Sequence, residues 1–174
     1  MFEPKDKSFD KDALQTPPYL FSWLDRKFHF DVDLAANAEH HFCESYFTQE
    51  NSAFDWDWME FGERGFCNPP YSKIDPWVAK AIDEAKNGFT TVMLIPEING
   101  EERYASILEH CKTIVHIVGR IGFVRPDDGT EYKNNNRGSV ILEFGAKYFD
   151  TPPNHIYVHR DEIKAEYEEL VKDE

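Results

Sequence analysis

The tetrapeptide Asn68-Pro69-Pro70-Tyr71 holds the groups needed to activate an amine on an aromatic ring. The lone pair of such an amine is delocalised into the ring until its two hydrogens are held out of plane. The side-chain oxygen of Asn68 and the main-chain carbonyl of Pro69 can accept those hydrogens. The two prolines fix the backbone angles, so the carbonyl is rigidly aimed, and Tyr71 can stack on a base. The tetrapeptide therefore predicts methyl transfer to an exocyclic amine; the alternative is a proline-rich turn with a buried tyrosine.

Regular elements flank this tetrapeptide on both sides. A short strand at 65–67 precedes it, and a helix that begins near Asp75, with Pro76 at its first position, runs to about Asn87. The apolar run 89–95 that follows is typical of a central strand buried on both faces. We therefore expect the tetrapeptide to lie in the loop after one strand of an open α/β sheet.

The rest of the chain continues the alternation of strands and helices. The fold class is α/β with a mostly parallel sheet and a C-terminal antiparallel hairpin, in a single domain over 1–174. Further expected elements are a helix at 18–24 capped by Thr16, a strand at 28–33, a helical turn at 39–43, a helix at 101–110, a strand at 113–118, hairpin strands at 119–124 and 139–144 joined by a polar loop, and a helix from about 161.

The net charge of the chain disfavours binding of nucleic acid over a wide surface. Nineteen basic against 33 acidic residues give a formal net charge of -14, whereas nucleic-acid binding proteins are commonly basic. The acidic residues cluster at the two ends, in a segment of about 1–12 and in the helix of about 161–174. A modest basic face around a pocket is compatible with this distribution, so we expect any DNA binding to be weak and salt-dependent.

Composition also bounds the compartment and the metal content. The 174 residues suit one domain, and no apolar run reaches membrane-spanning length, so we expect a cytoplasmic protein without a membrane partner. Cys43, Cys67 and Cys111 are odd in number and widely spaced, as reduced thiols in a cytosol are. His40, His41 and Cys43 match no common metal-site spacing, and we predict no metal.

A series of motifs runs through the chain in a recognisable order. They are Gln15-Thr16-Pro17, Phe30 to Ala36, Tyr46-Phe47-Thr48, Asp57-Trp58, Cys67 to Tyr71, Trp77, Gly119-Arg120-Ile121 and Gly138-Ser139-Val140. In these motifs the chain resembles the phage-type DNA adenine methyltransferases, which are small Dam-like enzymes. The resemblance covers roughly Asp12 to Phe144 and implies a Rossmann-like, S-adenosylmethionine-dependent methyltransferase fold.

The resemblance also implies a cofactor site for S-adenosyl-L-methionine. Asp33 matches the acidic residue of the first cofactor motif, whose carboxylate accepts from the methionine ammonium. The start of the first helix is expected to hold the methionine carboxylate. The usual glycine-rich turn is replaced by small residues around Ala35. The cofactor-binding residues expected on this basis are Gln15, Thr16, Pro17, Asp33, Ala35, Asp57 and Asn68.

For the substrate, the resemblance implies an adenine in DNA that is flipped out of the duplex and stacked on Tyr71. The methyl group is expected to transfer directly, without a covalent enzyme intermediate. The polar loop at 125–137 is a candidate for contacts to bases or phosphates, and a solvated hairpin tip is the alternative. The expected substrate-binding residues are Tyr71, Ser72, Lys73, Asn134, Asn136 and Arg137.

Other functions use similar parts. RNA amine methyltransferases and protein-glutamine methyltransferases share the tetrapeptide chemistry, but this chain lacks their glycine-rich first motif and an appended recognition domain. A catalytically inactive acidic DNA mimic is a third alternative, favoured by the charge alone. The chain length allows either a monomer or a homodimer.

Overall fold

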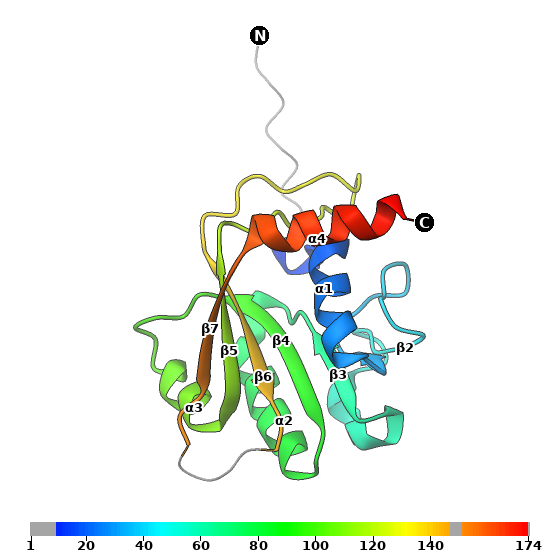
Figure 1. Cartoon of the computed structure of the whole chain (residues 1–174). Coiled ribbons are helices and arrows are strands. Elements are labelled where there is room, and N and C mark those ends of the chain that lie inside the picture. The colour runs from blue at the N-terminus through cyan, green and yellow to red at the C-terminus, as the bar shows by residue number, and fades with distance from the viewer. Residues whose placement is uncertain (1–9, 147–150, 174) are drawn as a thin grey trace.

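A single seven-stranded sheet organises the chain (Figure 1), in a computed structural model that describes residues 10–146 and 151–173. Most of the acidic N-terminal segment and Glu174 lie outside the described residues. The strand order is β2-β1-β3-β4-β6-β5-β7. The strands are β1 (Val32–Asp33), β2 (Ser45–Tyr46), β3 (Arg64–Cys67), β4 (Thr90–Pro96), β5 (Cys111–Val118), β6 (Ser139–Phe144) and β7 (Asn154–His159).

The helices lie on both faces of this sheet. They are α1 (Pro18–Phe28), α2 (Ile74–Lys86), α3 (Arg103–His110) and α4 (Arg160–Lys172), and the short 3-10 helices are η1 (Lys11–Ala13), η2 (Ala53–Asp55), η3 (Trp58–Phe61) and η4 (Tyr71–Lys73).

Two hydrophobic cores lie between the sheet and its helices. One core joins α2 and α3 to the sheet through Trp77 and Ile107, and the other joins α1 and α4 to it through Leu24 and Ile163. Successive residues of β4 point to opposite faces, so that Met93 and Ile95 enter the first core while Val92 and Leu94 enter the second. This arrangement confirms β4 as a central strand buried on both faces.

All neighbouring strands are parallel except where β6 is involved. β6 runs antiparallel to both β4 and β5, whereas the remaining pairs are parallel. The mostly parallel sheet and the antiparallel hairpin are therefore confirmed, but the first strand of the hairpin is β5 and not residues 119–124. Gly119 turns the chain at a φ of 99°. Beyond it, Ile121 and Phe123 are buried in the core beside α1, which explains their strand-like alternation.

The predicted helix starts need correction. Pro17 is the N-cap of α1, so Thr16 is not the cap. Helix α2 begins at Ile74, with Pro76 at its third position and no side-chain cap from Asp75. The first four N–H groups of a helix have no partner within it, so proline is tolerated anywhere in the first turn and marks the start only approximately.

Residues 39–43 are not helical, contrary to the prediction. The main-chain N–H groups of Glu39 and His40 donate to the side chain of Asn37, at 3.0 and 2.8 Å, and that of Phe42 donates to Asp33. Such side-chain acceptors compete with helical hydrogen bonds.

Strands β2 and β7 were not predicted, because β2 has two residues and β7 is an edge strand with mostly exposed side chains. No helix in the described ranges is long and apolar enough to cross a membrane.

Candidate active site

The predicted tetrapeptide follows β3 at the carboxyl edge of the sheet. The parallel register pairs Asp33 at the end of β1 with Phe66 of β3, and the N–H of Leu34 donates to the carbonyl of Phe66 at 2.8 Å. Asp33 and Asn68 therefore emerge from neighbouring parallel strands at the same edge, which is where open α/β sheets bind ligands.

The amide of Asn68 has one engaged end and one free end. Its Nδ2 donates to the main-chain carbonyl of Leu14 at 3.4 Å. Across the described part of the chain, its Oδ1 has no hydrogen bond. The main-chain groups of Gln15 and Val124 exchange two hydrogen bonds, both 2.9 Å long, which hold Leu14 in place. The amide is thus turned with its acceptor oxygen available to a substrate.

Tyr71 is packed between the two cores at the start of η4. Its ring lies edge-on to Phe123, with centroids 6.0 Å apart, and its buried hydroxyl has no hydrogen-bond partner in the part of the chain that the structure describes. Burial raises the pKa of this hydroxyl far above its usual range, so it stays neutral. Pro69 is buried and Pro70 is half-buried, as a rigid turn requires.

A small crevice lies against these residues. Its volume is about 10 Å³, and it is lined by Lys11, Asp12, Leu14, Asn68, Pro69, Tyr71 and Phe123. This space is about what a single water molecule needs. The chemistry-bearing groups therefore face a crevice that is too small for a base.

Asp33 is a buried carboxylate at this edge. It is 3% exposed, and it accepts hydrogen bonds from the N–H of Phe42 at 3.1 Å and of Ala35 at 3.4 Å. Desolvation by burial raises its pKa from 3.8 to about 6, and the two hydrogen bonds only partly oppose this. Within the described ranges no salt bridge reaches Asp33. A cationic ligand group would supply the missing counter-charge.

Two further polar groups lie buried near the start of α1. The hydroxyl of Thr16, a residue 3% exposed, and the Nε2 of Gln15 have no hydrogen-bond partner among residues 10–146 and 151–173. Pro17, which follows, is buried. A buried polar group left unpaired costs about 1–3 kcal/mol, so this pair fits a polar ligand better than it fits an apolar core. The two donors suit the carboxylate of an amino-acid moiety, and the acceptor Asp33 suits its ammonium; none of these three residues lines the crevice at Asn68.

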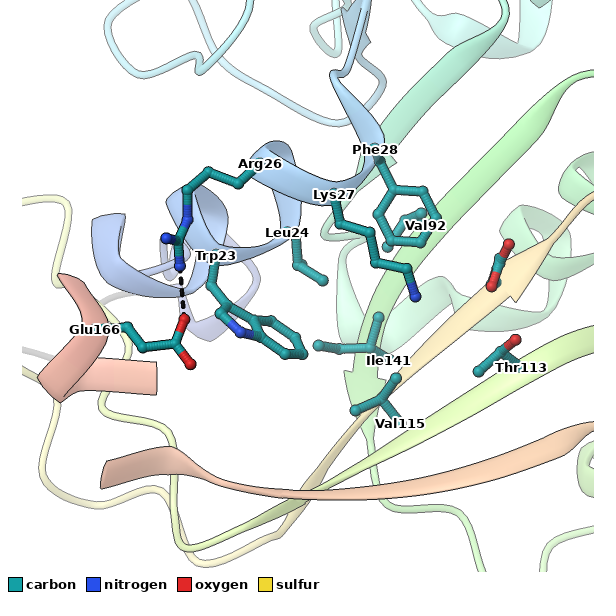
Figure 2. A pocket seen from close by; sticks show the side chains of 11 residues that line it. Trp23, Leu24, Arg26, Lys27, Phe28, Val92, Thr113, Val115, Ile141 and Glu166 are labelled. Atoms are coloured by element: carbon teal, nitrogen blue, oxygen red, sulfur yellow. Dashed lines mark hydrogen bonds and ion pairs between the residues drawn. The ribbon is translucent and has the colours of Figure 1, made fainter. Parts of the chain in front are cut away.

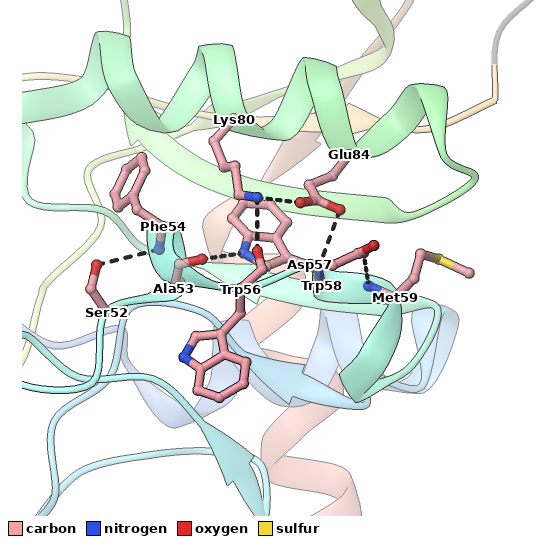
Figure 3. A network of polar contacts seen from close by, with 9 residues as sticks. All are labelled: Ser52, Ala53, Phe54, Trp56, Asp57, Trp58, Met59, Lys80 and Glu84. Carbon is pink, nitrogen blue, oxygen red and sulfur yellow. Dashed lines mark hydrogen bonds and ion pairs between the residues drawn. The ribbon is translucent and has the colours of Figure 1, made fainter.

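Asp57 lies elsewhere. It is exposed and caps η3 by accepting from the N–H of Met59 at 3.0 Å. The N–H of the adjacent Trp58 donates to Glu84, in the last turn of α2, and Glu84 pairs with Lys80 (Figure 3). Because α2 begins beside the tetrapeptide and runs away from it, the structure does not bring Asp57 to Asn68. Its predicted cofactor contact remains a prediction.

The predicted substrate residues divide into two groups. Ser72 and Lys73 are exposed on η4, directly after the tetrapeptide. Arg137 donates to the carbonyl of Glu97 at 2.9 Å and to the carboxylate of Glu101 at 3.0 Å, so the loop is tied to the segment after β4. The remaining two predicted residues, Asn134 and Asn136, are exposed on the same loop.

A larger cavity lies elsewhere in the molecule, away from this site. It measures about 340 Å³ and lies between α1, α4 and the sheet, with Val92, Val115 and Ile141 among its apolar lining (Figure 2). The side chains of Arg26 and Glu166, which also line it, form an ion pair with a nitrogen–oxygen distance of 2.7 Å. It shares no lining residue with the crevice at Asn68.

Sequence reasoning missed four residues of the crevice wall, namely Lys11, Asp12, Leu14 and Phe123. Leu14 acts through its carbonyl, which no side-chain pattern reveals, and it lies 54 residues before Asn68. The sequence pattern placed Phe123 in a strand, and Lys11 and Asp12 in an acidic N-terminal segment. The bridge between Gln15 and Val124, together with contacts of both segments to the tetrapeptide and the adjacent Ser72, brings them to one place.

A mostly parallel α/β sheet with an Asn-Pro-Pro-Tyr loop at its carboxyl edge, beside a buried carboxylate on the adjacent strand, defines a methyltransferase-like fold. The chain belongs to the DNA N-6-adenine-methyltransferase (Dam) family, whose family model matches residues 4–169.

Two phage proteins are similar over most of the chain. A DNA N-6-adenine-methyltransferase of Haemophilus phage HP1 (strain HP1c1) is 27% identical over 171 residues, which cover 95% of this chain and 98% of the phage protein. A DNA N-6-adenine-methyltransferase of Escherichia phage T1 is 27% identical over 148 residues, covering 76% of this chain and 62% of that protein. No solved structure matches significantly.

Proposed function

We propose that this protein transfers a methyl group from S-adenosylmethionine to the exocyclic amine of adenine in DNA. The observation that carries the proposal is the orientation of Asn68: its Nδ2 is held by Leu14, and its Oδ1 is free at the carboxyl edge of the sheet. The two phage relatives, both described as DNA N-6-adenine-methyltransferases, support adenine in DNA as the target.

The cofactor binds through a buried carboxylate that has no ion pair and through two buried donors, all within the described residues. Asp33 accepts from the ammonium of the methionine moiety, and Gln15 and Thr16 donate to its carboxylate beside Pro17. Ala35, which replaces glycine after β1, leaves room for close approach. When bound, S-adenosylmethionine supplies an electrophilic methyl group on a sulfonium.

The protein's own part in the reaction is to position the amine and accept its hydrogens. Asn68 Oδ1 and the carbonyl of Pro69 hold the two amino hydrogens out of the ring plane, so that the nitrogen lone pair points away from the ring. The nitrogen would become cationic as its bond to the methyl carbon forms and the carbon–sulfur bond breaks, with the sulfur leaving as a neutral thioether. The nitrogen would then lose a proton to water. No strong base and no covalent enzyme intermediate are required.

The target adenine must leave the duplex to reach Asn68, and it stacks on Tyr71. Ser72 and Lys73 bind the adjacent backbone, and the loop that carries Asn134, Asn136 and Arg137 contacts the flanking DNA. Given the net charge of -14, the protein binds DNA weakly and in a salt-dependent manner. It acts as a monomer or as a homodimer.

Transfer of a labelled methyl group tests the proposal. We expect label in a mixed-sequence duplex and none in the same duplex with each adenine replaced by purine, which lacks the 6-amino group. Label in the substituted duplex would exclude adenine as the target. Label in RNA or in a glutamine-containing protein, with none in DNA, would favour the alternative methyltransferase classes.

A further inference from the structure

The crevice at Asn68 cannot admit a base in the conformation described here. Its volume of about 10 Å³ suits one water molecule, and a purine is several times larger. Part of the wall must therefore move. Phe123 is 3% exposed within the second core, and Tyr71 is packed against both cores, so neither ring is free to swing away.

The remaining wall is a short helix with few attachments. η1 spans Lys11–Ala13 and has no buried residue. The carboxylate of Asp12 accepts a hydrogen bond from the N–H of Ser72 at 3.1 Å and another from the Ser72 hydroxyl. Apart from the N–H of the adjacent Leu14, which donates to the carbonyl of Lys11 at 3.2 Å, no other hydrogen bond or ion pair joins residues 10–13 to the rest of the described chain.

The segment just beyond η1 is anchored much more firmly. Gln15 exchanges two main-chain hydrogen bonds with Val124, and Thr16 and Pro17 are buried. A pivot near Leu14 thus moves η1 while the carbonyl of Leu14 stays beside Asn68. The amide of Asn68 keeps its orientation when the crevice opens.

We propose that residues Lys11–Ala13 form a gate over the target-base pocket and that Asp12 latches this gate to Ser72. This inference rests on the proposed function. A DNA phosphate and the Asp12 carboxylate are both anions, and they cannot occupy the donors of Ser72 together. Lys73, next in the chain, favours the phosphate. DNA binding therefore releases the latch at the place where the flipped base must enter.

The variant Asp12→Ala removes the latch, and Asp10→Asn is its matched control. Asp10 accepts from the N–H of Asp12 at 3.0 Å, and asparagine keeps this acceptor while removing the same unit of charge. We expect Asp12→Ala to raise kcat/KM for adenine-containing DNA about three- to tenfold, since a hydrogen-bonded closed state no longer competes. Asp10→Asn should change it less than twofold. An equal rise in both variants would show a charge effect alone, and an unchanged or lower value for Asp12→Ala would overturn the gate.

A second measurement is independent of catalysis. In the DNA-free protein, Asp12→Ala should speed hydrogen exchange at the amides of Ala13 and Leu14, which bond within η1, while Asp10→Asn should not. Unchanged exchange in Asp12→Ala would refute the latch even if the protein methylates DNA. If the natural protein methylates no DNA but Asp12→Ala speeds exchange, the proposed function fails and the latch stands.

A covalent closure tests the gate in the opposite direction. The double variant Asp12→Cys with Ser72→Cys places two thiols at the latch, and the native cysteines Cys43, Cys67 and Cys111 are all buried. We expect the oxidised variant to bind S-adenosylmethionine but to methylate DNA at least tenfold more slowly than after reduction. Equal rates before and after reduction, with the disulfide shown by mass spectrometry, would overturn the gate.

Discussion

Asn68 has a donor end that is held and an acceptor end that is free, and the proposed chemistry depends on this division. We expect Asn68→Ala to lower kcat about a hundredfold, the usual effect of removing one group that stabilises a transition state. The dissociation constant for S-adenosylmethionine should stay within about twofold. Single-turnover methylation and calorimetry measure the two quantities.

Asn135→Ala is the matched control for Asn68→Ala. Asn135 also donates its Nδ2 to a main-chain carbonyl, that of Ile121, at 2.9 Å. This variant should lower stability and leave the chemical step unchanged. If both asparagine variants lose turnover equally, the loss reflects loop structure and not the role of Asn68.

Asp33 links protonation to stability in the cofactor-free protein. Burial raises its pKa from 3.8 to about 6, so the folded state holds a proton where the unfolded chain has lost it. The stabilisation is present below the unfolded value and is lost as the pH rises through the folded one. We expect the free energy of unfolding to fall by about 2 kcal/mol more between pH 4 and 6.5 in the natural protein than in Asp33→Asn. Urea unfolding measures this, and equal losses would contradict it.

The same carboxylate should make cofactor binding depend on pH. Only the ionised form of Asp33 attracts the ammonium, so we expect affinity for S-adenosylmethionine to rise as the pH rises through about 6. Asp33→Asn should bind at least tenfold more weakly at pH 7.5 and lose this dependence. A titration series by calorimetry checks both, and an unaltered dissociation constant would remove Asp33 from the site.

Helix α2 supports the tetrapeptide from one side and the loop of η2 and η3 from the other. Glu84, 3% exposed, accepts from the N–H of Trp58 and pairs with Lys80, which also donates to the carbonyl of Trp56 at 2.8 Å (Figure 3). Trp58 is fully buried, and its indole donates to the carbonyl of Ala53 at 2.8 Å. This network fixes an irregular segment that has little regular structure of its own.

Removing the cation of this network leaves a buried carboxylate unpaired. We expect Lys80→Ala to lower the free energy of unfolding by roughly 3 kcal/mol, because an uncompensated buried charge is costly. Lys86→Ala on the same helix breaks only the exposed pair with Asp83 and should have no measurable effect. Chemical denaturation of both variants is the test, and similar stabilities would show that Lys80 does not compensate Glu84.

Across the whole molecule, the charge limits how DNA is held. With a net charge of -14, few cations are free to neutralise phosphates, so log K should fall with log salt at a slope of only about 1–3. Lys73 is exposed beside the tetrapeptide. We expect Lys73→Ala to reduce this slope by about one. Lys112→Ala, which removes the partner of Glu143, should leave it unchanged. Fluorescence anisotropy at several salt concentrations measures the slope, and equal slopes for natural protein and Lys73→Ala would exclude the phosphate contact.

Local patterns in the sequence were sufficient for much of the fold. The apolar run of β4, the helix after the tetrapeptide and the short strand before it each follow from side chains close together in the chain. The sequence also predicted that Asp33 ends one strand and that Asn68 follows another, and the pairing of β1 with β3 in the sheet makes these two strands neighbours. Two-residue β2 and exposed β7 leave no such pattern.

The chain order of amino acids thus determined which groups are available for chemistry: an amide acceptor, a rigid turn and a carboxylate at strand ends. Folding in three dimensions determined how they are oriented and enclosed. The carbonyl of Leu14 turns the Asn68 amide, burial sets the pKa of Asp33, and η1 covers the pocket. These effects depend on contacts between segments far apart in the chain, and hydrogen bonding and desolvation act through space, so no local pattern records them.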